Sequence, residues 1–176
     1  MFSFFSQVNV KRVLFAGLVL VLFAGFLGGC SVEPEDDTNY EGTLDGLVGK
    51  WVADYGDFFV ITGSGSSGTI KYYWDSSSST PGSEGNIEFV SNYDSSSGVI
   101  IVKYTRGATD PGKPFGAFYY LNLTGTTVSI NEAYDVSNWE NDVKTATREQ
   151  AIEKFTKGSM GNWIDPSYAV PYTKQN

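Results

Sequence analysis

The residues that could carry chemistry in this sequence are few, and their types exclude most catalytic designs. The chain of 176 residues has no histidine and a single cysteine. Nucleophilic catalysis through a serine–histidine or cysteine–histidine pair is therefore excluded, and so are ordinary zinc sites. The best carboxylate pair is Asp54 and Asp57 in "ADYGDF". A glycosidase needs two carboxyls across a cleft, but aspartate at a turn commonly caps the turn through its own backbone, and we interpret both as turn residues.

A calcium loop starting at Asp75 also fails. Its sixth position is Thr80, where glycine is needed, and its twelfth is Asn86, where a bidentate glutamate is needed. The sequence therefore predicts no catalytic residue, no metal site and no cofactor, so we expect a protein that is not an enzyme.

The single thiol, Cys30, lies at the end of an apolar segment. Lys11 and Arg12 precede the uncharged run "VLFAGLVLVLFAGFLGG", and acidic residues follow the cysteine in "CSVEPEDD". A basic start, an apolar stretch and small residues before a cleavage site are typical of a secretory signal peptide. The run also approaches the length of a bilayer span, but Gly28 and Gly29 favour cleavage.

The segment Leu27-Gly28-Gly29-Cys30 resembles the lipobox of bacterial lipoproteins. The resemblance implies that residues 1–29 are a signal peptide and that Cys30 becomes the N-terminus. It also implies a diacylglyceryl thioether on Cys30 and an amide-linked acyl chain such as palmitate. At about 0.8 kcal/mol per buried methylene, these chains exceed what stable anchoring requires. Ser31, where aspartate would favour inner-membrane retention, implies an outer-membrane location in the cell envelope.

The residues after the cysteine have the composition of a spacer. The stretch 31–46 is acidic, contains Pro34 and two glycines, and has almost nothing to bury. Such a segment does not offset its own ordering entropy, so residues 30–46 are expected to be a lipidated, flexible tether. Loss of Lys11 and Arg12 with the signal peptide lowers the formal charge from -8 to -10. This charge should repel nucleic acid, so no nucleic-acid partner is expected.

Residues 47–176 are expected to form one domain of antiparallel strands. Short runs rich in Val, Ile, Tyr, Phe and Trp are separated by clusters of Gly, Ser, Asp and Pro, which is typical of a meander. The runs lie at 49–55, 57–63, 68–75, 85–93, 98–105, 116–125 and 126–134. A helix is predicted over 148–155, because Thr147 and Gln150 fit a capping box and Gly158 fits a C-terminal cap. A last strand is expected within 160–172.

The start of the first strand, Gly49-Lys50-Trp51, resembles the G-x-W signature of the lipocalin and calycin families. The resemblance implies an all-β, single up-and-down barrel of about eight strands, with the tryptophan at its narrow end and a helix before the last strand. Those families usually place a late arginine over the tryptophan ring, whereas the last basic residue here is Lys174. The runs "GKWVADYGDFFVI", "IIVKY" and "YYLNLTGTTVSI" also resemble small lipoproteins of spirochaetes.

The aromatic residues are the remaining signal for function. Adjacent rings at Tyr72, Tyr73 and Trp74, and at Tyr119 and Tyr120, place rings on both faces of the sheet, either as a contact surface or as cross-strand packing. Alternation predicts a buried face made of Trp51, Ile70, Tyr72, Trp74, Ile87, Phe89, Ile100, Val102, Tyr104, Tyr119, Leu121, Leu123, Val128 and Ile130. An eight-stranded barrel is filled by side chains or holds one small ligand.

We therefore expect a filled barrel with a shallow, aromatic-lined mouth beneath the loops 75–85 and 106–116. Its ligand-binding residues would be Tyr72, Trp74, Tyr104 and Tyr119. The expected function is a monomeric, membrane-anchored, non-catalytic module that binds a small amphipathic ligand or a partner protein. The alternatives are a structural or host-interaction surface lipoprotein without a ligand and, third, a carboxylate-dependent hydrolase.

Overall fold

The computed structural model describes residues 39–107 and 110–175. The predicted signal peptide, Cys30 and the predicted tether up to residue 38 lie outside the described residues. Among the described residues, no helix is long and apolar enough to cross a membrane.

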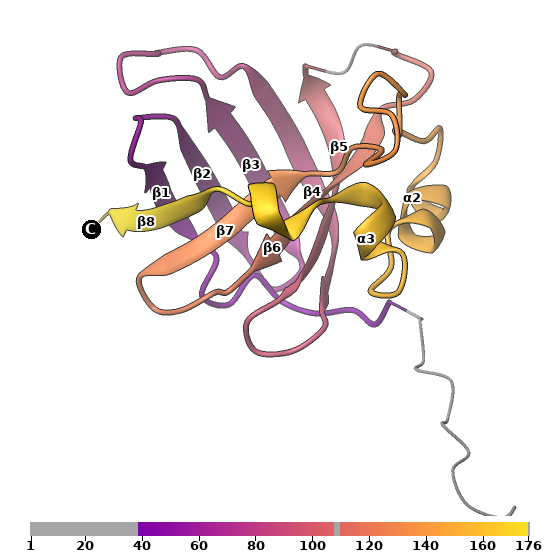
Figure 1. The fold of residues 1–176 in the computed structure, drawn as a ribbon, viewed down its shortest axis with the longest axis horizontal. Coiled ribbons are helices and arrows are strands. Elements are labelled where there is room, and N and C mark those ends of the chain that lie inside the picture. Colours follow the sequence, from indigo (N-terminus) through magenta and orange to yellow (C-terminus); the bar gives the residue numbers. More distant parts are fainter. Residues whose placement is uncertain (1–38, 108–109, 176) are drawn as a thin grey trace, which may run out of the picture. The chain divides into compact units, whose positions relative to one another are not determined.

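The strands close into one barrel in sequence order, as expected (Figure 1). Each strand pairs antiparallel with the next, and the last pairs with the first. The strands are β1 (Gly49–Ala53), β2 (Phe58–Ser64), β3 (Ser67–Tyr73), β4 (Ser83–Asn92), β5 (Gly98–Arg106), β6 (Phe115–Leu121), β7 (Thr127–Glu132) and β8 (Pro171–Gln175). The prediction of an all-β, up-and-down eight-stranded barrel is thus confirmed.

Helices lie between β7 and β8, and the first two pack on the outer wall of the barrel. They are α2 (Arg148–Lys154), α3 (Met160–Trp163) and the 3-10 helix η1 (Pro166–Tyr168). The predicted capping box at Thr147 is present, with its side chain accepting from Gln150 N. The predicted end at Gly158 is wrong, because α2 already ends with Phe155 as its C-cap, and the Phe155 ring is buried against the wall.

The two ends of the barrel differ. The β1–β2, β3–β4 and β5–β6 connections lie at one end, which we call the mouth, and the long helical connection leaves β7 and enters β8 at this same end. The hairpins β2–β3, β4–β5 and β6–β7 lie at the other end, which we call the floor.

Residues 39–48 close the floor. Leu44 and Leu47 are fully buried beside Trp51 in the interior cluster. Backbone bonds hold the segment to the hairpins, with Gly42 N donating to Val90 O at 2.7 Å and Leu44 N to Gly65 O at 2.7 Å. The expectation that the tether stays flexible to residue 46 is therefore wrong for residues 39–46. Composition favoured disorder, but the burial of Leu44 and the two backbone hydrogen bonds hold the segment against the floor.

Trp51 lies in the floor of the barrel, and its contacts with Leu47 and Lys174 account for the Gly49-Lys50-Trp51 motif. Its ring is completely buried, and its Nε1 donates to Leu47 O at 2.7 Å. Lys174 Nζ stands 5.1 Å from the ring centroid, where the resembled families usually have an arginine. Gly49 adopts φ 144, and a Cβ added there would lie 2.8 Å from Lys174 Cε. The positive φ is what favours glycine here, and the absence of a side chain also leaves Lys174 room to cross the tryptophan ring.

The barrel interior is filled by side chains, many of them aromatic. Its buried members are Leu44, Leu47, Trp51, Ala53, Phe59, Ile61, Ile70, Ile87, Val90, Ile100, Val102, Tyr104, Phe118, Tyr120, Val128, Ile130 and Tyr172. A second cluster lies between the outer wall and the helices, and includes Val99, Ile101, Ala117, Ala151, Phe155 and Ile164.

Three residues predicted for the interior belong to this outer cluster instead. Phe89 is displaced because a register shift between Ile87 and Phe89 changes the alternation of β4 by one residue. Tyr119 and Leu121 are displaced because β6 is apolar on both faces, so that alternation alone did not give its phase.

Candidate functional site

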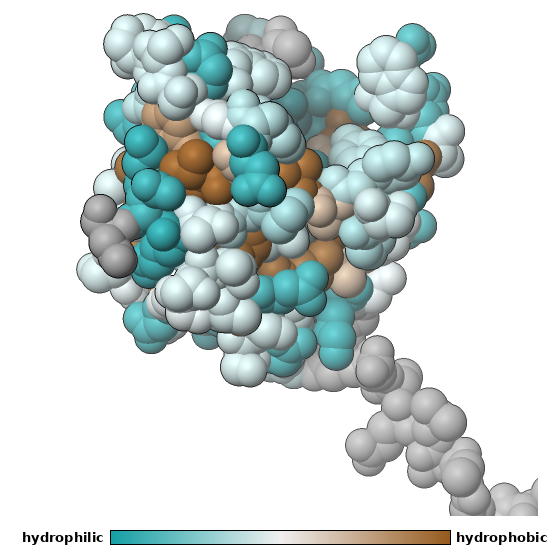
Figure 2. Space-filling view, turned by 60° about the vertical axis from the view of Figure 1, so that its left-hand side comes forward, coloured by the Kyte–Doolittle hydropathy of each residue, from teal (hydrophilic) through white to brown (hydrophobic). Residues whose placement is uncertain are grey.

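The mouth contains a cavity of about 220 Å³. Its walls come from the β1–β2 turn and from strands on all sides of the barrel. The lining residues are Tyr55, Asp57, Phe59, Tyr72, Ser83, Phe118, Ile130, Asn131, Glu132, Tyr134, Val170 and Tyr172. Figure 2 shows one face of the molecule, on which apolar side chains lie recessed among polar ones.

Asp57 supplies a buried carboxylate to this cavity. Only 2% of its surface is exposed, and the Tyr172 hydroxyl donates to its Oδ2 at 2.8 Å. Its Oδ1 is buried and has no hydrogen-bond partner within the part of the chain that the structure describes. Asp54, on the same turn, is exposed. The two carboxylates are therefore not arranged across a cleft.

The interpretation of Asp57 as a side-chain turn cap is wrong. The β1–β2 turn is closed by backbone bonds, Gly56 N to Ala53 O at 3.0 Å and Ala53 N to Asp57 O at 3.0 Å. The turn therefore does not use the Asp57 carboxylate, which lines the cavity. There the carboxylate accepts a hydrogen bond from Tyr172 of β8.

The Asp57 charge acts on the tyrosines around it. Burial, and secondly Asp57, raise the pKa of Tyr172 and that of Tyr72 above the ordinary value of about 10. The same two causes raise the pKa of Tyr55. These phenols stay protonated at physiological pH, so the cavity keeps its hydroxyl donors in a negative field.

Phe59 organises the aromatic walls. Its ring centroid lies 4.9 Å from that of Tyr72, 5.7 Å from that of Phe118 and 5.1 Å from that of Tyr172. The contacts with Phe118 and Tyr172 are edge-to-face, at 83° and 71°. Such pairs are favourable beyond their buried area, so the rings form a fixed wall around the carboxylate.

Of the four predicted ligand-binding residues, only Tyr72 lines the cavity. Trp74 is 69% exposed at the rim and packs edge-to-face on Tyr72, with the ring centroids 5.0 Å apart. Tyr104 is buried behind the lining, and its hydroxyl donates to Glu132 Oε1 at 2.5 Å. Tyr119 is wrongly placed by the prediction: it lies on the outer wall and donates to Thr156 O at 3.3 Å.

Sequence reasoning missed Asp57, Phe59, Phe118 and Tyr172. A signal was present for the first two, since residues 57, 59 and 61 share one face of an alternating strand and Ile61 is apolar. Tyr172 follows two prolines in a stretch without alternation, and no local pattern would have shown that it reaches Asp57.

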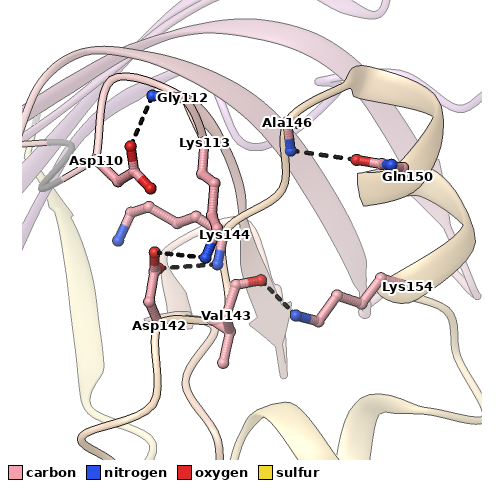
Figure 3. Close-up of polar contacts among 9 residues, drawn as sticks. All are labelled: Asp110, Gly112, Lys113, Asp142, Val143, Lys144, Ala146, Gln150 and Lys154. Carbon is pink, nitrogen blue, oxygen red and sulfur yellow. Dashed lines mark hydrogen bonds and ion pairs between the residues drawn. The ribbon is translucent and has the colours of Figure 1, made fainter.

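A second recess, of about 460 Å³, lies beside α2 and is lined by Lys113, Lys144 and Lys154 among others. Figure 3 shows these lysines around Asp142 and Val143. Each amino group is engaged: Lys113 with Asp142 at 3.6 Å, Lys144 with Glu132 at 3.3 Å, and Lys154 with Val143 O at 2.5 Å. Burial lowers the pKa of Lys154. Because its cations are already paired, this recess is the weaker candidate.

Comparison of the chain with protein-family models, with curated proteins and with solved structures gives no match.

Proposed function

We propose that this protein is a lipid-anchored, non-catalytic binding protein of the bacterial cell envelope, and that the mouth of its barrel holds one small ligand. The observation that carries the proposal is Asp57, a buried carboxylate with one unpartnered oxygen in a cavity walled by aromatic rings. Ligand sites are typically apolar pockets with a few placed polar groups, and buried polar groups are normally satisfied. A ligand bound at the mouth would supply the missing hydrogen bond to Asp57 Oδ1.

The size of the site limits the ligand. Pockets for drug-sized ligands measure about 300–1,000 Å³, and this cavity measures about 220 Å³. Below it the interior is filled by rings, with Trp51 and Tyr120 completely buried. The ligand is therefore a small amphipathic molecule and not a long-chain lipid.

The anchor rests on the sequence. The lipobox at residues 27–30 and the charge pattern around it support export and acylation of Cys30. The buried G-x-W tryptophan with Lys174 over its ring supports kinship with lipocalin-like carriers. A monomer anchored in the outer membrane would present the mouth to ligands in its compartment.

A hydrolase is disfavoured as the function. Asp54 is exposed whereas Asp57 is buried, and the second carboxylate at the mouth, Glu132, is held by Tyr104 and Lys144. A carboxylate so engaged is poorly suited to the second role that a two-carboxylate mechanism requires.

A structural or host-interaction lipoprotein is the second candidate, and a specific observation favours it. Trp139, Tyr168 and Trp74 are exposed by 78%, 74% and 69%. Tryptophan and tyrosine are enriched in protein interfaces, and the filled interior is compatible with a protein that binds no small molecule.

Native mass spectrometry of the protein isolated from its own membrane tests the proposal. We expect wild type to retain one small molecule and Ser83→Trp, which fills the cavity from β4, to lose it. Thr173→Trp, a matched bulky change on the exposed face of β8, should retain it. Absence of a retained molecule from all three proteins would favour the ligand-free interaction protein, and a molecule retained equally by all three would show that it does not bind in the mouth.

A further inference from the structure

We infer that the ligand of the mouth is a small organic cation, a primary ammonium group on an apolar or aromatic body. The inference rests on the proposed function, because it uses the same cavity. It follows from an imbalance of charge at the site, from the kind of hydrogen-bonding group that is missing, and from the rings around it.

The charge imbalance lies at Asp57. The residues lining the cavity include two carboxylates, Asp57 and Glu132, and no lysine or arginine. Glu132 forms an ion pair with Lys144 at 3.3 Å. Asp57 is the more deeply buried of the two, and no ion pair to it occurs among residues 39–107 and 110–175. Burying a charge is costly unless it is paired, so the site is complementary to a cation that the protein does not itself supply.

The missing hydrogen-bonding group is a donor. An ionised carboxylate only accepts hydrogen bonds. Tyr172 satisfies Oδ2, and Oδ1 has no partner within the described part of the chain. A primary ammonium group carries three donors and forms the shorter, stronger class of charge-assisted bond with a carboxylate. A quaternary ammonium group would neutralise the charge but leave Oδ1 without a donor.

The rings complete the match. Phe59, Tyr72, Phe118 and Tyr172 surround the entry to Asp57, and their faces and edges form the apolar wall. Cations are attracted to aromatic faces within about 6 Å of the ring centroid, more strongly when desolvated. The same lining disfavours a carboxylate or phosphate ligand, because it contains no cationic side chain.

Three probes of similar shape and different charge test the inference by calorimetry on the purified full chain. They are 2-phenylethylammonium, 2-phenylethanol and 3-phenylpropanoate. We expect the ammonium probe to bind at least about tenfold more tightly than the alcohol, equivalent to about 1.4 kcal/mol, and the carboxylate probe not to bind. Tetramethylammonium should bind more weakly than the primary ammonium.

The matched variants are Asp57→Asn and Asp54→Asn. Both remove one charge from the same turn, but only Asp57 lines the cavity. Asp57→Asn should weaken binding of 2-phenylethylammonium at least about tenfold, whereas Asp54→Asn should leave it within about twofold. If Asp57→Asn does not fold, the ratio of the ammonium probe to the alcohol on wild type decides the question.

The outcomes separate the two proposals. Equal binding of the ammonium probe and the alcohol, both abolished by Ser83→Trp, would overturn the cationic ligand and leave the small-ligand site standing. A neutral or anionic molecule released from the native protein would do the same. Failure of every probe, together with native protein that carries no molecule, would overturn both.

Discussion

At the scale of single residues, the floor and the mouth of the barrel use charged groups in opposite ways. Lys174 is exposed along part of its length but places its amino group over the buried Trp51 ring, and Gly49 has no side chain to obstruct it. Asp57 is buried, and Tyr172 donates to its Oδ2; the Tyr72 hydroxyl also lies near enough to the carboxylate for a hydrogen bond to raise the pKa of Tyr72, whereas no partner of Oδ1 is seen in the described residues. The first arrangement is complete, which is typical of a structural feature. The second lacks a partner, which is typical of a ligand site.

The floor predicts a large stability cost for Trp51→Ala. The change removes a fully buried ring, its bond to Leu47 O and its contact with Lys174. Truncation of a buried tryptophan costs about 3–5 kcal/mol, to be measured as the free energy of unfolding in denaturant. Trp139→Ala, at an exposed tryptophan, should change stability by less than about 0.5 kcal/mol. A loss below about 1 kcal/mol for Trp51→Ala would contradict the role of the signature.

Buried phenols predict that stability falls at alkaline pH. Burial raises the pKa of Tyr120 to about 12 and also raises that of Tyr104, Tyr172 and Tyr72. The unfolded chain loses these protons near pH 10, whereas the folded protein retains them. Since the unfolded state then binds fewer protons, the free energy of unfolding decreases as pH rises above about 10.

This alkaline effect is measured by denaturant unfolding at several pH values, with tyrosinate absorbance as the titration signal. Tyr120→Phe should make the decrease shallower, because it removes one of the raised groups. A free energy of unfolding that stays constant from about pH 9 to pH 12 would contradict the burial of these hydroxyls.

At the scale of elements, the strand count, the order of the strands and the capped helix could be predicted, because runs, turns and caps are local signals. It was harder to predict which residues of each strand face the interior. That prediction was wrong in β4, where a register shift follows Ile87, and in β6, where the helices bury the outer face as well. Tyr119 was assigned to the site for that reason. Asp57 was missed because its partner, Tyr172, lies 115 positions away.

The aspartate turns show the same limit. Asp75, Asp94, Asp135 and Asp165 each accept from the backbone N–H two positions later. Side-chain hydrogen bonds from nearby residues lower the pKa of each of these carboxyls, and the backbone bonds add to the effect. Each of these four aspartates has a serine two positions later, whereas Asp57 is followed by Phe58 and Phe59 and its carboxylate bonds across the barrel to Tyr172. Exposed aspartates in such turns can be expected to accept hydrogen bonds from the turn backbone. Asp57 differs from them because it is buried.

The docked segment 39–48 predicts that Leu44→Ala destabilises the barrel. Leu44 is 1% exposed and belongs to the interior cluster, so its truncation should cost about 2–5 kcal/mol in chemical denaturation. Val48→Ala, at a neighbouring apolar residue that is 38% exposed, should cost less than about 1 kcal/mol. Equal effects of the two changes would indicate that the segment does not close the floor.

At the scale of the whole molecule, the proposed account joins an anchor, a spacer and a barrel with one open end. Formal charge is -8 for the full chain, and such an acidic surface should attract organic cations toward the mouth through its long-range field. The proposed anchor would hold the barrel at the membrane surface, so that the protein does not diffuse away from the envelope.

The proposed anchor predicts that Cys30→Ser releases the protein from the membrane fraction or leaves it unprocessed. The reason is that acylation at this sulfur would supply the membrane affinity. Detergent-phase partitioning measures the effect, and Ser31→Ala is the matched control that should partition as wild type does. If Cys30→Ser also partitions like wild type, the apolar segment itself is the anchor.

The central claim is that the mouth, and no other surface, holds a small cation against Asp57. Isotope-edited NMR on the full chain with 2-phenylethylammonium tests it most directly, through contacts between the bound probe and assigned side chains. The account predicts contacts from the probe to the rings of Phe59, Phe118 and Tyr172, which are lost in Asp57→Asn. Contacts to exposed Trp139 or Tyr168 instead, or contacts unchanged in Asp57→Asn, would contradict it.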